Sequence, residues 1–144
     1  MPGAKKTTAT TIPTLRYHDA TAAVDWLCRA FGFEKRMVVP GEPGTIAHAE
    51  LEFGNGMIML GSAGKHGGGY DELVTTPREI GGRSTQSAYV IIADPDAHYR
   101  QAVAAGAEIV LPLEQKGYGG SGYTCRDLEE NLWSFGDYDP WASA

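Results

Sequence analysis

The chain repeats one pattern of helix signals, and this repetition restricts its fold more than any other feature. Asp19 stands where a helix of the first half begins and Gly32 where it ends. Asp94, followed by a proline, and Gly106 hold the same places in the second half. Aspartate is a favoured N-cap, proline fits the first helical position, and glycine fits the position after the last turn. The two halves therefore predict two helices of similar length.

Strand signals follow each helix in the same order. Gly32 precedes Met57, the start of the last strand in the first half, by 25 positions, and Gly106 precedes Leu132 by 26. Each half is thus predicted to be a βαβββ unit. The predicted helices cover residues 20–31 and 96–105. The predicted strands cover residues 11–17, 33–39, 45–53, 57–61, 84–93 and 108–113, followed by two strands around the turn at 127–131.

A single βαβββ unit cannot cover its sheet alone. Two units side by side would bury the faces that carry the helices and leave the other faces as a concave cavity. We therefore predict an α+β fold of two tandem βαβββ modules forming a curved mixed sheet around that cavity. The predicted segments are a tail at 1–10, modules at 11–63 and 84–140, a connecting loop at 64–83, and a tail at 141–144.

Alternation along the strands predicts which side chains face the cavity. Trp133 and Phe135 share one face of their strand and are expected to pack beneath a helix, while Ser134 points to the other side. In the first half His48, Glu50 and Glu52 share a face by the same rule. A two-residue loop formed by Asn55 and Gly56 would place Glu52 opposite Met59 and Glu50 opposite Gly61.

Composition excludes several classes of protein. The chain has 144 residues, 42% of them hydrophobic, a net charge of -6 and a pI near 5.1, which suits one globular domain and argues against binding to nucleic acid or an anionic membrane. No apolar run is long enough to cross a bilayer, and Met1 to Thr11 lacks the pattern of a signal peptide. Two cysteines make no disulfide framework, so we expect a cytoplasmic protein.

The stretch 117–122 matches the glycine fingerprint of dinucleotide-binding proteins. That motif works only where a helix follows, because the helix N-terminus meets the pyrophosphate. A strand is predicted to follow here, so the match is discarded. No nucleophile-elbow motif is present either.

The chain resembles the vicinal oxygen chelate superfamily, which contains glyoxalase I, bleomycin-resistance proteins and extradiol dioxygenases, and within it the PhnB-like branch. The resemblance covers residues 11 to 140 and specifies the fold better than the activity. The motifs that carry it are Tyr17-His18-Asp19, Ala30-Phe31-Gly32-Phe33, His48-Ala49-Glu50-Leu51, Ala104-Ala105-Gly106-Ala107, and Arg126-Asp127 to Trp133-Ser134-Phe135-Gly136.

Catalytic members of that superfamily usually hold a divalent metal with one His, Glu or Gln from each of four strands. The resemblance places these positions at Ile12, Met59, Ser87 and Ser134. An alkyl group, a thioether and two hydroxyls do not supply the nitrogen and anionic oxygen donors that such a metal needs. We therefore expect no metal and no other cofactor, unless a metal site has been relocated.

Four further residues are candidates for the lining of the cavity. His48 and Glu50 could act as acid and base or contact a ligand, although a solvated strand face explains the same alternation. Arg16 is expected to face the cavity, where glutathione-using relatives hold a substrate carboxylate; its alternative is an ion pair with Glu50 or Glu52. Tyr89 shares the parity of Ser87 and is expected to form an aromatic wall.

The remaining reactive side chains are weaker candidates. His18, His66 and His98 are expected to be exposed, and Cys28 and Cys125 are interpreted as small apolar residues.

Two functions remain open. The first is metal-independent binding or sequestration of a small organic molecule, at Arg16, His48, Glu50, Met59, Ser87, Tyr89 and Ser134. The second is an enzyme of the same superfamily, a lyase, isomerase, epimerase or dioxygenase, that uses a relocated metal or the acid and base named above. The resemblance also implies a homodimer. The tail around Trp141 would then clasp the partner, or else pack on its own domain.

Overall fold

The fold is known from a computed structural model that describes residues 2–64, 69–115, 117 and 119–142. Two compact units are present. The first unit comprises Met1–Cys28 and Gly32–Thr76, and the second comprises Arg29–Phe31 and Pro77–Ala144. Each contains a four-stranded mixed sheet, so the predicted α+β fold of two tandem βαβββ modules is confirmed.

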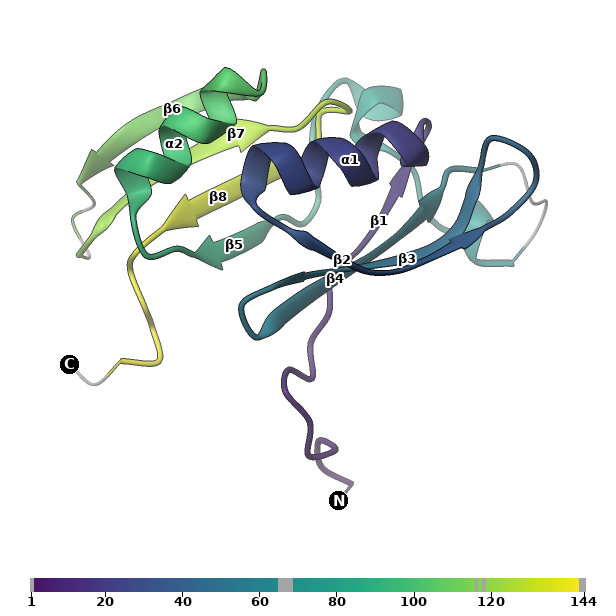
Figure 1. Cartoon of the computed structure of the whole chain (residues 1–144), viewed down its shortest axis with the longest axis horizontal. Helices are drawn as coiled ribbons and strands as arrows, with labels where there is room; N and C mark the ends of the chain where they lie inside the picture. The colour runs from purple at the N-terminus through teal and green to yellow at the C-terminus, as the bar shows by residue number, and fades with distance from the viewer. Residues whose placement is uncertain (1, 65–68, 116, 118, 143–144) are drawn as a thin grey trace. The chain divides into compact units, whose positions relative to one another are not determined.

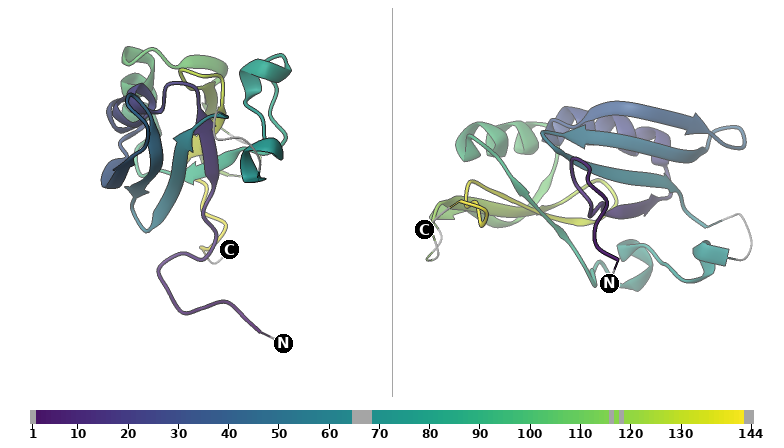
Figure 2. Two further views of the ribbon diagram at one scale, coloured as in Figure 1. Left: turned by 90° about the vertical axis from the view of Figure 1, so that its right-hand side faces the viewer. Right: turned by 90° about the horizontal axis from the view of Figure 1, so that it is seen from below.

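The sheet of the first unit has the strand order β1-β4-β3-β2 (Figure 1). β1 and β4 pair in parallel, and the other neighbours pair antiparallel. Residues 2–13 form no helix or strand and extend away from this sheet (Figure 2). The elements are β1 (Thr14–Tyr17), α1 (Ala20–Phe31), β2 (Glu34–Pro40), β3 (Ile46–Phe53) and β4 (Gly56–Ser62).

Local chemistry fixes both ends of α1. The Asp19 carboxylate accepts a hydrogen bond from the backbone N–H of Ala22 at 3.1 Å. Gly32 takes a left-handed conformation with φ of 89° and donates its N–H to the carbonyl of Cys28. Both predicted caps are therefore present. The buried side chains of the helix follow its period and form one stripe: Ala20, Ala23, Val24, Trp26, Leu27, Ala30 and Phe31.

The hairpin between β3 and β4 corrects the predicted register by two residues. Its two-residue loop is Gly54-Asn55, not Asn55-Gly56, since Phe53 pairs with Gly56. Gly54 has a φ of 56°, and glycine is favoured at the first loop position because the turn needs a positive φ there. Glu50 therefore lies opposite Met59, and not opposite Gly61. The shift is even, so the faces of the strands are as predicted.

The connection between the modules contains two short 3-10 helices, η1 (Gly69–Glu72) and η2 (Pro77–Ile80), drawn in teal in Figure 2. The connecting loop predicted at 64–83 therefore includes helical turns. η1 lies in the first unit and η2 in the second.

The sheet of the second unit has the order β5-β8-β7-β6, the same arrangement as in the first. β6 runs two residues beyond its prediction and β5 is shorter than predicted. α2 begins at the predicted proline and packs on β6 and β7 (Figure 1). The elements are β5 (Ala88–Ile91), α2 (Pro95–Ala104), β6 (Glu108–Gln115), β7 (Ser121–Arg126) and β8 (Leu132–Gly136). Among the described residues, no helix has the length and apolar character needed to span a bilayer.

Aromatic rings form the core of the second unit. The ring of Phe31 lies 5.3 Å from that of Trp133 and 4.6 Å from that of Phe135, centroid to centroid. Tyr123 and His98 complete the cluster. Trp133 and Phe135 are fully buried, as the alternation of β8 predicts, and such rings supply much of the apolar area that a small domain buries.

Candidate functional site

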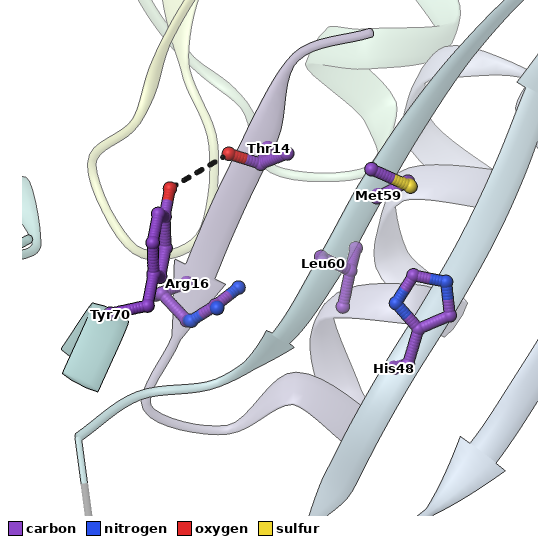
Figure 3. Close-up of a pocket in the computed structure, with 6 residues that line it drawn as sticks. All are labelled: Thr14, Arg16, His48, Met59, Leu60 and Tyr70. Carbon is purple, nitrogen blue, oxygen red and sulfur yellow. Dashed lines mark hydrogen bonds between the residues drawn. The ribbon is translucent and has the colours of Figure 1, made fainter. Parts of the chain in front are cut away.

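One face of the first unit's sheet carries a pocket of about 210 Å³. Met59 of β4 lies opposite Thr14 of β1 on one side and opposite Glu50 of β3 on the other. Two residues further along each strand, Arg16 pairs with Gly61, which has no side chain. Figure 3 shows the lining, which comprises Thr14, Arg16, His48, Met59, Leu60 and Tyr70.

The 3-10 helix η1 supplies one wall of the pocket. The Tyr70 hydroxyl lies 3.2 Å from the Thr14 hydroxyl, and the Arg16 guanidinium carbon lies 4.8 Å from the centre of the Tyr70 ring. The Arg16 Nε donates to the Asp71 carboxylate at 3.2 Å. Arg16 is thus held by an ion pair and a cation–π contact at once, which limits its rotation.

This geometry corrects one expectation. The carboxylate partner of Arg16 is Asp71, not Glu50 or Glu52. Glu50 and Glu52 instead pair with Arg36, whose guanidinium nitrogens lie 3.6 Å and 2.8 Å from their carboxylate oxygens. The register of β2 is irregular between Lys35 and Met37, and Arg36 lies at that irregularity, so strict alternation does not assign its face.

The candidate acid and base are in contact. The Nε2 atom of His48 lies 3.0 Å from Oε2 of Glu50, while the other carboxylate oxygen of Glu50 faces Arg36. His48 lines the pocket, whereas Glu50 does not. A carboxylate in this position fixes the orientation and tautomer of an imidazole, which is what a general base needs.

Two partners of the site had no signal in the sequence analysis. Tyr70 lies 56 residues after Thr14 and Asp71 lies 55 after Arg16, and no repeat or alternation links them to β1. In the sequence, Tyr70 and Asp71 stand side by side directly after a run of glycines, and this is the one local feature that could have drawn attention to them.

The scan against family models matches residues 10–135 to the glyoxalase/bleomycin resistance protein/dioxygenase superfamily. This range covers most of both modules. The chain belongs to this superfamily.

Other members resemble this chain along most of its length. A Mycobacterium bovis protein, uncharacterized protein Mb0911c, is 30% identical over 124 residues, which is 86% of this chain and 80% of that protein. TioX from Micromonospora sp. ML1, which is known from a crystal structure, shares 35% sequence identity with this chain. The two structures align with a TM-score of 0.69 over 94% of this chain and all of TioX. The fosfomycin resistance protein FosX from Listeria monocytogenes, solved with Mn(II) and sulfate, shares the fold at 12% identity, with a TM-score of 0.65 and 94% coverage of each chain.

The residues at the superfamily's usual metal positions do not fit a divalent ion. The resemblance assigns these positions to Ile12 and Met59 in the first unit and to Ser87 and Ser134 in the second. None supplies an imidazole or a carboxylate. Within the described parts of the chain, no three His, Cys, Asp or Glu side chains gather in a group able to hold a metal ion.

The second unit holds the other residues suggested by the superfamily resemblance. Ser134 and Thr124 lie opposite each other, and their hydroxyls share a hydrogen bond of 2.8 Å. Tyr89 pairs with Ser134, and its hydroxyl donates to the Tyr138 carbonyl at 2.7 Å. Ser87 is exposed and precedes β5. Tyr89 therefore anchors the C-terminal segment through its polar end.

His98 departs from the expectation that it is exposed. Its Nε2 donates to the Phe31 carbonyl at 2.8 Å, and its Nδ1 lies 2.7 Å from the Tyr123 hydroxyl. Burial lowers the pKa of His98, against the opposing effect of the bond to Phe31, and burial raises the pKa of Tyr123. The exposed His18 bonds to Thr76.

The remaining predictions about reactive side chains have separate outcomes. His66 lies outside the described residues. Cys125 is buried and Cys28 half-buried, consistent with their interpretation as small apolar residues.

Proposed function

We propose that this protein binds a small organic molecule in the pocket of the first unit, without using a metal ion. The observation that carries the proposal is the position of Met59. The superfamily resemblance assigns it to a strand position that holds a metal ligand in catalytic relatives, and here it belongs to a pocket lining that also includes Tyr70. A thioether and an aromatic ring bind apolar and aromatic groups, not hard cations.

The rest of the lining supports an amphiphilic ligand. Arg16, His48 and Thr14 place polar groups around the side chain of Met59. Ligand sites typically combine an apolar lining with a few fixed polar groups that orient the molecule. The net charge of -6 favours neutral or cationic compounds over anions. In the second module, Ser87, Tyr89 and Ser134 are separately proposed as ligand-binding residues.

A matched pair of variants tests the site. Met59 and Met57 lie on the same strand and share a face, but only Met59 lines the pocket. Thermal-shift screening against neutral and cationic aromatic compounds, with native mass spectrometry for co-purified molecules, identifies ligands of the wild type. Met59→Lys should abolish their binding, while Met57→Lys should retain it. Equal binding to both variants would contradict the proposal.

The contact between His48 and Glu50 supports a second function, that of an enzyme using acid–base chemistry. An imidazole oriented by a carboxylate at 3.0 Å can take a proton from a carbon next to a carbonyl group. Incubating a bound carbonyl compound with the protein in D₂O distinguishes the two functions. Deuterium incorporation that is lost in His48→Gln but not in Met57→Lys supports an enzyme, whereas recovery of unlabelled compound supports binding alone.

We also propose that the protein forms a homodimer through its C-terminal segment. Trp141 is 88% exposed, although the Tyr89 hydroxyl anchors the nearby Tyr138 carbonyl. An exposed indole on an anchored segment is suited to cover a second copy. Sedimentation velocity should show a dimer for the wild type and a shift toward monomer for Trp141→Ser. A wild-type monomer at all concentrations would contradict this assembly.

A further inference from the structure

Arg16 is the cationic group that lines the pocket, and its charge is already balanced within the unit. Its Nε donates to Asp71 at 3.2 Å, and its Nη1 lies 3.4 Å from the Leu15 carbonyl oxygen. The Asp71 side chain is only 15% exposed, so water screens this pair less than it would on an open surface. A ligand therefore meets a neutral ion pair and not an isolated cation.

Carboxylates outnumber arginines around this part of the sheet. Asp71 faces Arg16, and Glu50 and Glu52 face Arg36. Glu50 also bonds to His48, which stands at the edge of the pocket. An anionic group brought to Arg16 would be repelled by Asp71 at short range and by Glu50 beyond it.

Arg16 nevertheless keeps donors for a ligand. A guanidinium has more N–H groups than the contacts with Asp71 and Leu15 occupy. Figure 3 shows its terminal nitrogens directed toward β4, the strand that carries Met59 and Leu60. The contact with the Tyr70 ring holds the group in that position before a ligand arrives. Pre-ordered donors of this kind reduce the entropic cost of binding.

We propose that the pocket selects ligands that present a neutral hydrogen-bond acceptor, such as an amide or ketone carbonyl, to Arg16, and that Asp71 excludes carboxylates from the same position. This proposal rests on the binding function proposed above and specifies its ligand class. The apolar or aromatic part of the ligand lies on Met59, and the carbonyl points to Arg16. Asp71 is thus a specificity-determining residue that does not itself need to contact the ligand.

A pair of isosteric probes tests the selectivity. 1-Naphthaleneacetamide and 1-naphthaleneacetate share one aromatic body and differ in whether the polar group is neutral or anionic. Titrations of the full-length chain followed by amide-resolved NMR report both affinity and location. The wild type should bind the amide about tenfold more tightly than the carboxylate, the ratio expected for one unfavourable charged contact.

Two variants separate the role of Asp71 from that of overall charge. Asp71→Asn should remove the preference, because Arg16 then becomes an uncompensated cation that accepts the carboxylate. Glu72→Gln removes the same unit of charge from an exposed neighbour in η1 that does not line the pocket, and should keep the preference. Arg16→Gln should weaken binding of the amide about tenfold, and this readout remains if Asp71→Asn folds poorly.

The outcomes distinguish this inference from the proposed function. Equal affinity of the wild type for both probes, with shifts centred on Met59, would overturn the selectivity while leaving a binding pocket. A preference for the carboxylate would overturn it as well. Absence of binding by either probe would overturn the ligand class, and the screen with Met59→Lys and Met57→Lys would then decide independently whether the pocket binds anything.

Discussion

The indole N–H of Trp133 donates to the Asp127 carboxylate at 3.0 Å, inside the hairpin that joins β7 to β8. The other oxygen of the same carboxylate accepts the backbone N–H groups of Glu129 and Asn131. Asp127 is buried, so water could not take the place of its carboxylate as the acceptor for these donors. One side chain therefore holds both the turn and the largest aromatic residue of the second unit's core.

Asp127→Ala should destabilise the protein by about 3 kcal/mol, because it leaves buried donors without an acceptor. Asp137→Ala is the matched control. Its carboxylate accepts the N–H of Ser121 at 2.7 Å, but the residue is exposed and water can replace it, so the loss should be about 1 kcal/mol or less. Urea denaturation measures both values. Equal losses in the free energy of unfolding would show that burial does not raise the cost of removing the Asp127 carboxylate.

His98 predicts a loss of stability in mild acid. Burial holds the pKa of His98 in the folded chain below its ordinary value of 6.5. Between these two values the unfolded chain binds a proton that the folded chain does not, so the free energy of unfolding decreases as pH falls below 6.5 and is fully retained above it. The aromatic neighbours Phe31, Tyr123 and Phe135 add no charge there, since burial raises the pKa of Tyr123.

Urea denaturation of the wild type and of His98→Gln at several pH values between about 5 and 8 measures this contribution. The variant should have a flatter pH dependence below 6.5, whatever its absolute stability. His18→Gln serves as control, because His18 is exposed and lies at the start of α1 in the first unit. A slope unchanged in His98→Gln would contradict the assignment.

The two thiols should differ in reactivity. Burial, with a smaller effect of Asp127, raises the pKa of Cys125 to about 12. Burial also raises the pKa of Cys28, but Lys35 opposes the shift and the residue is only half-buried. Because the thiolate is the reactive form, iodoacetamide at about pH 8 should label Cys28 first and Cys125 only after unfolding. Intact mass measurement on Cys28→Ser, which should show no early label, checks the order.

Gly61→Ala should destabilise the first unit by about 2 kcal/mol. A Cβ at this position would lie 3.0 Å from the Ala47 carbonyl oxygen, which belongs to the paired backbone of β3 and has little freedom to move. Gly56→Ala on the same strand meets its nearest atom at 3.4 Å and should change stability by less than about 1 kcal/mol. Thermal denaturation of both variants compares the two positions.

Local signals in the sequence were sufficient for the order and type of the elements. The caps Asp19 and Gly32 act within their own helix, so neighbouring residues alone determine them. The alternation of Trp133 and Phe135 is likewise local and predicted their burial correctly. The hairpin register was wrong by two because Gly54 and Gly56 flank Asn55 symmetrically, and only the pairing of the strands decides which glycine enters the loop.

Contacts between distant segments could not be predicted in the same way. Tyr70 and Asp71 reach β1 from a connection with no periodicity, and Arg36 lies where β2 departs from regular alternation. The partner of Arg16 was therefore assigned to the wrong carboxylates. His98 was expected to be exposed because it lies in the first turn of its helix, and its contacts with the aromatic cluster of the second unit account for its partial burial.

The compact second unit includes Arg29–Phe31, the last three residues of α1. Residues 32–76 separate them from the rest of that unit along the chain. A fragment that begins at Pro77 would lack Phe31, and with it the carbonyl that accepts the hydrogen bond from His98. The Trp133 and Phe135 rings, which pack against the Phe31 ring, would then be exposed. Although the two modules repeat one pattern, we therefore expect the later one not to fold on its own. Split-protein reporters or circular permutants of this chain should keep the last turn of α1 with the C-terminal half.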